Sequence, residues 1–174
     1  MNLTGNQRIG LISASILALD QLTKGIVLAL LPVGAEHVIL DGFFKFVHWH
    51  NDGAAFSTFS GQTEVLAIIS LLALAALFLF RHHFSAHRVL GQIALGLMFG
   101  GILGNLVDRL LPSRRKVIDF LYFNLQPRGG GEIGFPAFNV ADSAICIGVG
   151  LLFILSWQAD ANPKPGPSLQ TTRP

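Results

Sequence analysis

Residues 65–80 have the sequence VLAIISLLALAALFLF, and this stretch decides the class of fold. Ser70 is the only polar residue in it, and no charge interrupts it. An α-helix crosses the hydrocarbon core of a bilayer, about 30 Å, in about 20 residues. The segment is slightly shorter than that, so we expect a membrane-spanning helix whose ends lie in the interface.

Three further apolar segments accompany this one, over residues 9–31, 89–111 and 137–158. Hydrophobic residues make up 51% of the chain and charged residues only 13%, which is about half the charged fraction of a soluble domain. We therefore predict an α-helical integral membrane protein with four transmembrane helices. Residues 1–158 are expected to form a single four-helix domain, and the Pro-rich residues 159–174 a disordered tail.

The composition also limits the classes of function. A single cysteine, Cys146, excludes a disulfide framework and a cysteine-based metal cluster. The net charge is +2, and the basic residues form no long run. Contact with membrane lipid is therefore expected, and binding of nucleic acid is not.

The connections between the apolar segments differ in character. Residues 81–88 form a short basic loop. The longer connection over residues 32–64 contains two β-prone runs on either side of Asp41-Gly42, which is typical of a β-hairpin. Residues 117–125 are also rich in β-formers and could add a third strand. Four spans put both termini on one side of the membrane, together with the 81–88 loop. That side carries five basic residues, and the two longer connections on the other side also carry five, so the charge count leaves the orientation open.

The first apolar segment contains two charged residues, Asp20 and Lys24, one helical turn apart. A charge at the centre of a span costs about 2.5–3.5 kcal/mol on insertion scales, so such residues are functional candidates. Two interpretations remain open for this pair. It either neutralises itself so that the helix inserts, or it lines a polar site.

The third apolar segment combines small and polar residues. Glycines at four-residue intervals, Gly96, Gly100 and Gly104, are typical of close helix packing. A neighbouring face carries a polar stripe that consists of Gly101, Asn105 and Asp108. Arg109 follows directly, and it could simply extend to the interface.

The fourth apolar segment begins with FNVADS at residues 138–143. A helix cap would explain Asn139, but it would not explain Asp142, one turn further in. A partly buried aspartate needs a partner, and the best candidate is Asp119, which lies among large apolar residues in the preceding connection. The alternative is that Asp119 lies on the solvent face of a strand.

Two carboxyl groups held together in a low-dielectric place have a chemical use. Desolvation and mutual repulsion keep one of them protonated while the other is charged. The charged group deprotonates a water, and the neutral one donates to a carbonyl oxygen, as in aspartic peptidases. This chemistry needs no metal and no other cofactor. His48 and His50, which share one face of a predicted strand, could bind a metal. They lack an evident third ligand, so we interpret them as residues of the membrane interface.

Four motifs, taken together, resemble those of a known family. They are NDGAAFS at residues 51–57, GILGNLVDR at 101–109, VIDF at 117–120 and FNVADS at 138–143; DQLTK at 20–24 also fits. Each motif alone is weak, but the set is specific in this order and at these spacings. Over residues 9–158 the chain resembles the bacterial lipoprotein signal peptidases, also called signal peptidase II.

The resemblance implies a membrane aspartic endopeptidase that cuts diacylglyceryl-modified prolipoproteins just before the lipidated cysteine. It implies four membrane helices with a small extracytoplasmic β-sheet, cytoplasmic termini and the bacterial cytoplasmic (inner) membrane. The family's two catalytic aspartates correspond to Asp119 and Asp142. The positions that shape or support the site correspond to Asn51, Gly101, Asn105, Asp108, Arg109, Asn139, Asp20 and Lys24. The expected partners are the lipidated precursor and membrane lipids, and we expect a monomer.

Two features depart from the family pattern, and two other functions remain as alternatives. Asp52 adds an acid within the first motif, and residues 126–134 form a glycine-rich insertion. A proton- or cation-coupled carrier would depend most on Asp20 near the middle of a span. A non-enzymatic assembly factor would depend on the glycine stripe of the third segment.

Overall fold

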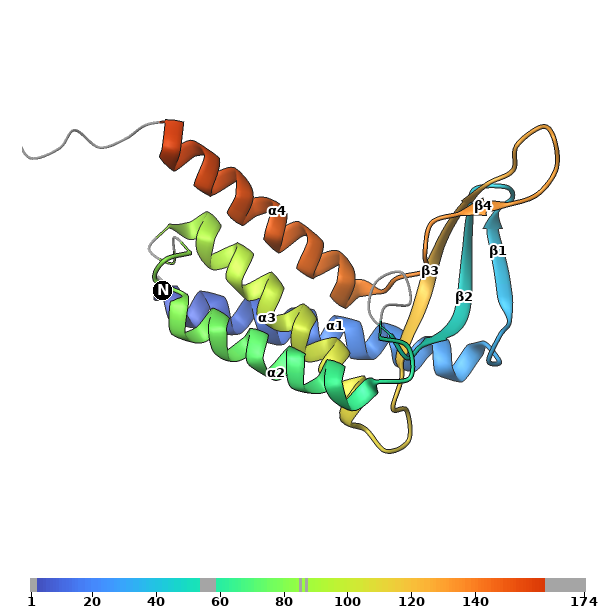
Figure 1. Ribbon diagram of the computed structural model, residues 1–174, viewed down its shortest axis with the longest axis horizontal. Helices are drawn as coiled ribbons and strands as arrows, with labels where there is room; N and C mark the ends of the chain where they lie inside the picture. Colours follow the sequence, from blue (N-terminus) through green and yellow to red (C-terminus); the bar gives the residue numbers. More distant parts are fainter. Residues whose placement is uncertain (1–2, 54–58, 85, 87, 162–174) are drawn as a thin grey trace, which may run out of the picture.

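The computed structural model describes residues 3–53, 59–84, 86 and 88–161. This part of the chain forms helices α1 (Gly5–Leu30), α2 (Thr63–Phe80), α3 (Val89–Leu110) and α4 (Val140–Ala161). All four are long and apolar enough to cross a membrane, so the predicted membrane-helix class is confirmed. Figure 1 shows the helices as an elongated bundle with a small sheet at one end.

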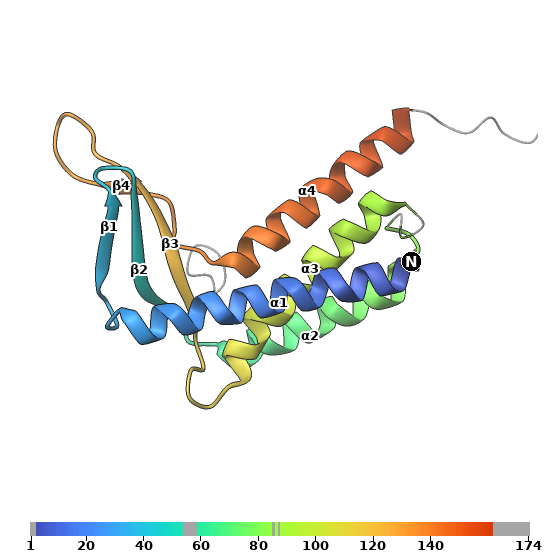
Figure 2. The ribbon, with the colours of Figure 1, turned by 180° about the vertical axis from the view of Figure 1, so that it is seen from behind.

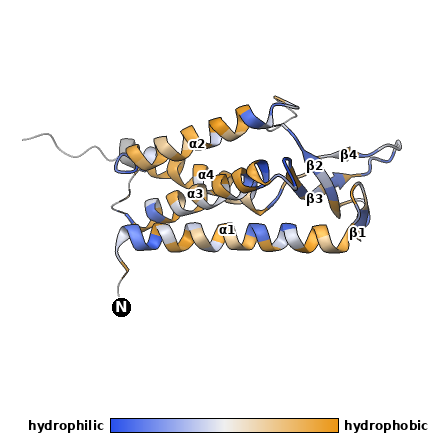
Figure 3. Ribbon diagram, turned by 90° about the horizontal axis from the view of Figure 1, so that it is seen from below, coloured by the Kyte–Doolittle hydropathy of each residue, from blue (hydrophilic) through white to orange (hydrophobic). Residues whose placement is uncertain are grey.

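Helix α3 is the central helix of the bundle, because it packs against each of the other three. More than half of its apolar window is buried, against less than a quarter in α1, α2 and α4. Those three helices therefore expose many large apolar side chains, and Figure 3 shows how widely apolar residues are spread along them. Helix α4 packs along α3, with Gly101 of α3 against Ala141 at the start of α4 and Gly148 of α4 against Ala94 further on. It diverges from α1 toward its C-terminal end (Figure 2).

The glycines of α3 allow the helices to approach closely, as the sequence predicted. A Cβ atom at Gly96 would lie 2.7 Å from a side-chain carbon of Ile12, and one at Gly100 would lie 2.7 Å from the carbonyl oxygen of Ser13. Both contacts are shorter than real Cβ atoms tolerate. The backbones of α1 and α3 are thus in direct contact over this stretch.

The sheet is antiparallel, with the order β1 (Glu36–Leu40), β2 (Phe44–Asn51), β3 (Val117–Leu125) and β4 (Ile133–Gly134). The predicted hairpin forms around Asp41-Gly42, where Gly42 has a φ of 69°. Strand β3 adds to β2 as expected, with Asn51 opposite Val117 at one end and Phe44 opposite Phe123 at the other. The glycine-rich residues 126–134 begin directly after β3, and the last two of them form β4.

Contacts between α1 and β3 hold the sheet against the bundle. Val27 of α1 packs with Ile118 and Phe120 of β3, and Leu31 and Phe46 extend this cluster. The sheet thereby lies across the C-terminal ends of α1 and α3 and the N-terminal ends of α2 and α4 (Figures 1 and 2).

Helix α4 differs from the expected bounds at both ends. It begins at Val140 rather than at residue 137, because Phe138 pairs with Leu121 of β3 through backbone hydrogen bonds and Asn139 caps the helix. It continues to Ala161, three residues into the expected tail. The rest of that predicted disordered tail lies outside the described residues.

Candidate active site

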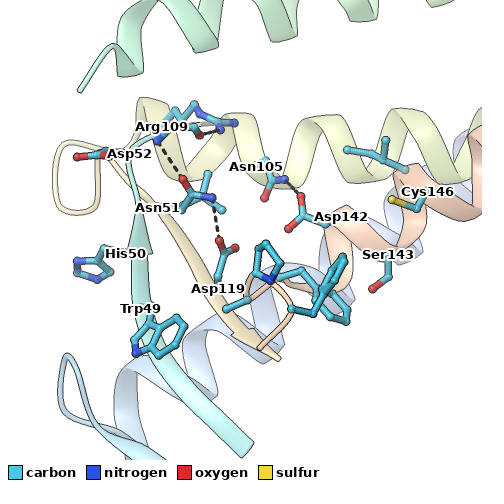
Figure 4. A pocket seen from close by; sticks show the side chains of 17 residues that line it. Trp49, His50, Asn51, Asp52, Asn105, Arg109, Asp119, Asp142, Ser143 and Cys146 are labelled. Carbon is cyan, nitrogen blue, oxygen red and sulfur yellow. Dashed lines mark hydrogen bonds between the residues drawn. The ribbon is translucent and has the colours of Figure 1, made fainter. Parts of the chain in front are cut away.

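A pocket of about 780 Å³ lies where the sheet meets the helix bundle. Side chains from β2, α3, β3 and the N-terminal turns of α4 line it (Figure 4). The polar residues among them are His50, Asn51, Asp52, Asn105, Arg109, Asp119, Asp142 and Ser143. Most of the remaining wall is apolar and comes from Trp49, Val117, Phe135, Pro136, Ala137, Phe138 and Ile145.

Asp119 is buried on β3, with only 3% of the residue exposed, so the alternative that placed it on a solvent face is wrong. The side-chain amide of Asn51 donates to its Oδ2 at 2.9 Å, and the side-chain amide of Asn139 donates to its Oδ1 at 2.8 Å. Burial, together with the neighbouring Asp142 carboxyl, raises the pKa of Asp119 to about 7 despite these two hydrogen bonds. This carboxyl therefore changes its protonation state near neutral pH.

Asp142 is held by a reciprocal cap at the start of α4. Its backbone N–H donates to Oδ1 of Asn139 at 2.9 Å, and the backbone N–H of Asn139 donates to Oδ2 of Asp142 at 3.2 Å. This arrangement is a capping box, so a helix cap accounts for Asp142 as well as for Asn139, contrary to our expectation. The Asn105 side chain donates to the other oxygen, Oδ1, at 2.7 Å.

Asn139 connects the two carboxyl groups. Its side-chain amide donates to Asp119, and its backbone N–H donates to Asp142. Within the part of the chain that the structure describes, no hydrogen bond joins the two carboxyls directly. The space between them opens into the pocket (Figure 4), which leaves room for a small molecule that contacts both.

Asn105 lies between Asp142 and a buried ammonium. Its Oδ1 accepts from Nζ of Lys24 at 3.0 Å and from the side-chain amide of Asn139 at 3.1 Å, while its own amide donates to Asp142. Because an amide oxygen only accepts and an amide nitrogen only donates, these partners fix which way the side chain points. Asn105 therefore presents a donor to Asp142 in one defined orientation.

The predicted pair of Asp20 and Lys24 forms and is fully buried, with Nζ 2.8 Å from Oδ2. Lys24 also contacts Oδ2 of Asp108 at 2.6 Å. The second oxygen of Asp20 accepts from the backbone N–H of Ala141 in the first turn of α4, at 3.0 Å. The pair is thus neutralised within the protein, as the first interpretation held. It supports the helix that carries Asp142, but it does not itself line the pocket.

Gly101 and Gly104 bring α3 against its neighbours at the level of the site. A Cβ atom at Gly101 would lie 2.5 Å from the carbonyl oxygen of Ala141, and one at Gly104 would lie 2.5 Å from Oδ2 of Asp20. Arg109 turns toward the pocket and donates to the carbonyl oxygen of Gly53 at 3.0 Å. Asn51 accepts from the N–H of the same glycine at 2.9 Å, so Arg109 and Asn51 together fix the end of β2.

The sequence did not identify two partners of Asp108. Nη1 of Arg114 lies 2.5 Å from Oδ1 of Asp108, and it also donates to Oε1 of Gln21 at 2.9 Å. Arg114 lies in the turn after Pro112, where no periodicity relates it to α3. The side-chain amide of Gln21 donates to the same oxygen of Asp108 at 3.4 Å. Gln21 lies inside the DQLTK stretch, and its position beside Asp20 was the only available signal.

The histidines of β2 point to one face, as expected, and form a hydrogen-bonded pair. Their Nε2 atoms are 3.2 Å apart, and Nδ1 of His48 contacts the carbonyl oxygen of Leu31 at 2.8 Å. His50 lies on the opposite side of β2 from Asp142 in Figure 4. Across residues 3–53, 59–84, 86 and 88–161, no three His, Cys, Asp or Glu side chains gather in a way that could hold a metal ion.

Fold and site together define a multi-pass membrane protein in which a buried carboxyl group, Asp119, and a half-buried one, Asp142, line a pocket at one end of the helix bundle. Residues 12–158 match the family model Peptidase_A8, described as signal peptidase (SPase) II. The lipoprotein signal peptidase of Desulforapulum autotrophicum is 41% identical over 155 residues, 86% of this chain and 91% of that protein. The lipoprotein signal peptidase of Bacillus pumilus is 37% identical over 145 residues, 83% of this chain and 88% of that protein.

A solved structure agrees with these sequence matches. It is a bacterial membrane enzyme determined by the in meso method at 2.3 Å resolution. It is 32% identical to this chain with a TM-score of 0.76, and the match covers 90% of this chain and 92% of that one. The chain is therefore a membrane protease, and it belongs to the signal peptidase II family.

Proposed function

We propose that this protein removes signal peptides from diacylglyceryl-modified prolipoproteins by cutting just before the lipidated cysteine, with Asp119 and Asp142 as the catalytic pair. The observation that carries the proposal is the bridge through Asn139, which holds both carboxyls at the edge of one pocket. A pKa of about 7 at Asp119 supports a pair that shares one proton at neutral pH.

In the proposed mechanism the two carboxyl groups act as a unit. A water between them loses a proton to the ionised carboxylate and attacks the scissile carbonyl carbon, while the protonated carboxyl donates to the carbonyl oxygen. The tetrahedral intermediate then collapses, the C–N bond breaks, and the new amine takes up a proton from the pair. Asn51, Asn105 and Asn139 keep the carboxyl oxygens aimed into the pocket without adding a charge.

The location of the pocket supports a lipidated substrate. It lies at the end of the bundle, so the acyl chains of the substrate can remain in the bilayer while the scissile peptide reaches the carboxyls. We further propose that the sheet and pocket face the extracytoplasmic side of the bacterial inner membrane, with cytoplasmic termini. The protein is proposed to act as a monomer in contact with membrane lipid.

The two alternative functions have less support. A carrier would need the transported ion to reach Asp20, but that side chain is 0% exposed and is paired with Lys24 and with a helix N–H. For an assembly factor, the glycines of α3 would have to face a partner protein. They contact α1 and α4 of the same chain instead.

Cleavage of a defined precursor tests the proposal. The purified chain, in detergent, is incubated with a diacylglyceryl-modified prolipoprotein and, in parallel, with the same precursor lacking the lipid. We expect mass spectrometry to find the signal peptide ending at the residue before the cysteine, and only from the modified precursor. A folded protein that leaves the modified precursor intact, or that cuts both precursors equally, would contradict the proposal.

A further inference from the structure

Arg114 completes the charge balance of the buried cluster below the pocket. The side chains of Asp20, Lys24 and Asp108 are all 0% exposed. Two carboxylates and one ammonium leave one negative charge unbalanced in a place where charges are costly to bury. The guanidinium of Arg114, 18% exposed, supplies the missing positive charge at Asp108.

The other charged groups around this cluster do not take this role. Arg109, the neighbour of Asp108 on α3, turns away and donates to the carbonyl oxygen of Gly53. Asp119 from β3 and Asp142 from α4 add carboxyl groups on the side of the pocket. Arg114 is therefore the cation that meets Asp108 from outside the bundle, and Gln21 fixes its position by accepting from the same Nη1 atom.

A series of short contacts connects Arg114 to the carboxyl of Asp142. Nη1 of Arg114 holds Oδ1 of Asp108, and Oδ2 of Asp108 holds Nζ of Lys24 at 2.6 Å. Lys24 in turn donates to Oδ1 of Asn105 at 3.0 Å, and Asn105 donates to Asp142 at 2.7 Å. The orientation of Asn105 thus depends on the position of Lys24. That position depends in turn on Asp108, which forms ion pairs with both Lys24 and Arg114.

From this connection we infer that Arg114 is a positioning residue for the reaction, acting on Asp142 through Asp108, Lys24 and Asn105. Without the guanidinium, Asp108 draws Lys24 toward itself and away from Asn105. The amide of Asn105 is then free to rotate, and its donor no longer faces Asp142 in a fixed way. The inference rests on the proposed function, because it assigns Arg114 to the same carboxyl pair.

Steady-state kinetics on the lipidated precursor test the inference with three variants and the parent protein. We expect Arg114→Gln to lower kcat about tenfold, equivalent to about 1.4 kcal/mol, with KM changed less than twofold, since Arg114 does not line the pocket. Arg114→Lys keeps the positive charge and should recover most of kcat. Arg115→Gln is the matched control, because Arg115 is 67% exposed and pairs with Glu64 instead; it should behave like the parent.

A double variant separates an effect through Asp108 from a general loss of structure. If Arg114 acts through Asp108, then Asp108→Asn combined with Arg114→Gln should be no slower than Asp108→Asn alone. Multiplied losses in the double variant would contradict the relay. So would an Arg114→Gln protein that keeps more than half of the parent kcat, or a loss that Lys does not recover.

A readout that does not depend on cleavage distinguishes failure of this inference from failure of the proposed function. The side-chain amide signals of Asn105 are followed by ¹⁵N NMR in detergent, assigned by their absence in Asn105→Ala. We expect Arg114→Gln to shift or broaden them and Arg114→Lys to restore them. Unchanged signals in Arg114→Gln would overturn the inference even if the parent cleaves, and a parent that does not cleave would overturn only the proposed function.

Discussion

The contact between α3 and α4 at Gly101 offers a sharp test of how helix packing sets the geometry of the pocket. In Gly101→Ala the new methyl group would lie 2.5 Å from the backbone oxygen of Ala141 and 2.8 Å from a side-chain carbon of Ile145. The oxygen belongs to the backbone, so no rotamer change relieves the contact. The two helices must separate by about half an ångström, the strain expected of an overpacked interface.

The displacement falls on the first turn of α4, next to Asp142. The hydrogen bond from Asn105 to Asp142 spans this same interface at 2.7 Å. Overpacking costs about 1–3 kcal/mol of stability, and alanine returns up to about 1 kcal/mol through helix propensity. A misplacement of about 1 Å can cost about 100-fold in rate, so we expect kcat to fall about tenfold with a smaller change in stability.

The assay compares cleavage rates and thermal unfolding in detergent for Gly101→Ala and a control, Gly150→Ala. Gly150 lies on α4 with nothing within 4 Å of the position of its added methyl group. The control should match the parent in rate and unfold at the same or a slightly higher temperature. If Gly101→Ala cleaves within twofold of Gly150→Ala, then close packing of α3 on α4 does not position Asp142.

Three further outcomes are expected. The effect of Asp119→Asn on thermal stability should be more favourable at pH 8 than at pH 5. The folded-state pKa of Asp119, about 7, lies above the unfolded value, so its burial destabilises the parent increasingly as pH rises toward 7. An equal effect at both pH values would argue against a raised pKa. Lys24→Met should lower the free energy of unfolding by about 3–5 kcal/mol, because it leaves Asp20 and Asp108 buried without their shared ammonium. A loss below about 1 kcal/mol in denaturant titrations would contradict a stabilising role for that ammonium. His83→Cys and Ser113→Cys, each made in a Cys146→Ala background, should be labelled from opposite sides of the membrane in sealed cells. Labelling of both from one side would contradict the four-span arrangement.

Hydrophobicity and local turn chemistry predicted most of the fold from the sequence. The four apolar segments became the four helices, and the Asp41-Gly42 turn with the β-prone residues 117–125 gave the core of the sheet. The predicted start of α4 was wrong, because Phe138, expected in the helix, pairs with Leu121 of β3 instead. That contact joins residues far apart in the sequence, so the hydrophobic periodicity of the fourth segment could not predict it.

The sequence indicated which residues to consider for the site, but not the contacts between them. Asp119 and Asp142 attracted attention because a carboxyl among apolar residues is costly. The bridge through Asn139 and the fixed orientation of Asn105 depend on three elements meeting at one point. Arg114 escaped notice because an arginine in a polar turn is ordinary in sequence, and only its proximity to a buried carboxylate gives it a role.

The central claim, that Asp119 and Asp142 act as one catalytic unit, is tested most directly by initial rates of Asp119→Asn, Asp142→Asn and the double variant at equal membrane content. Asn keeps the size and removes the titratable proton, so each single change should lower the rate by about 10²–10⁴-fold. The double variant should be scarcely slower, because members of one catalytic unit are not additive. Asp41→Asn in the exposed hairpin turn is the control and should cleave normally, whereas Asp20→Asn should lose less than either member of the pair. Retention of more than about a tenth of the activity by Asp119→Asn or Asp142→Asn, above the range for a lost acid–base group, would contradict the assignment of that residue.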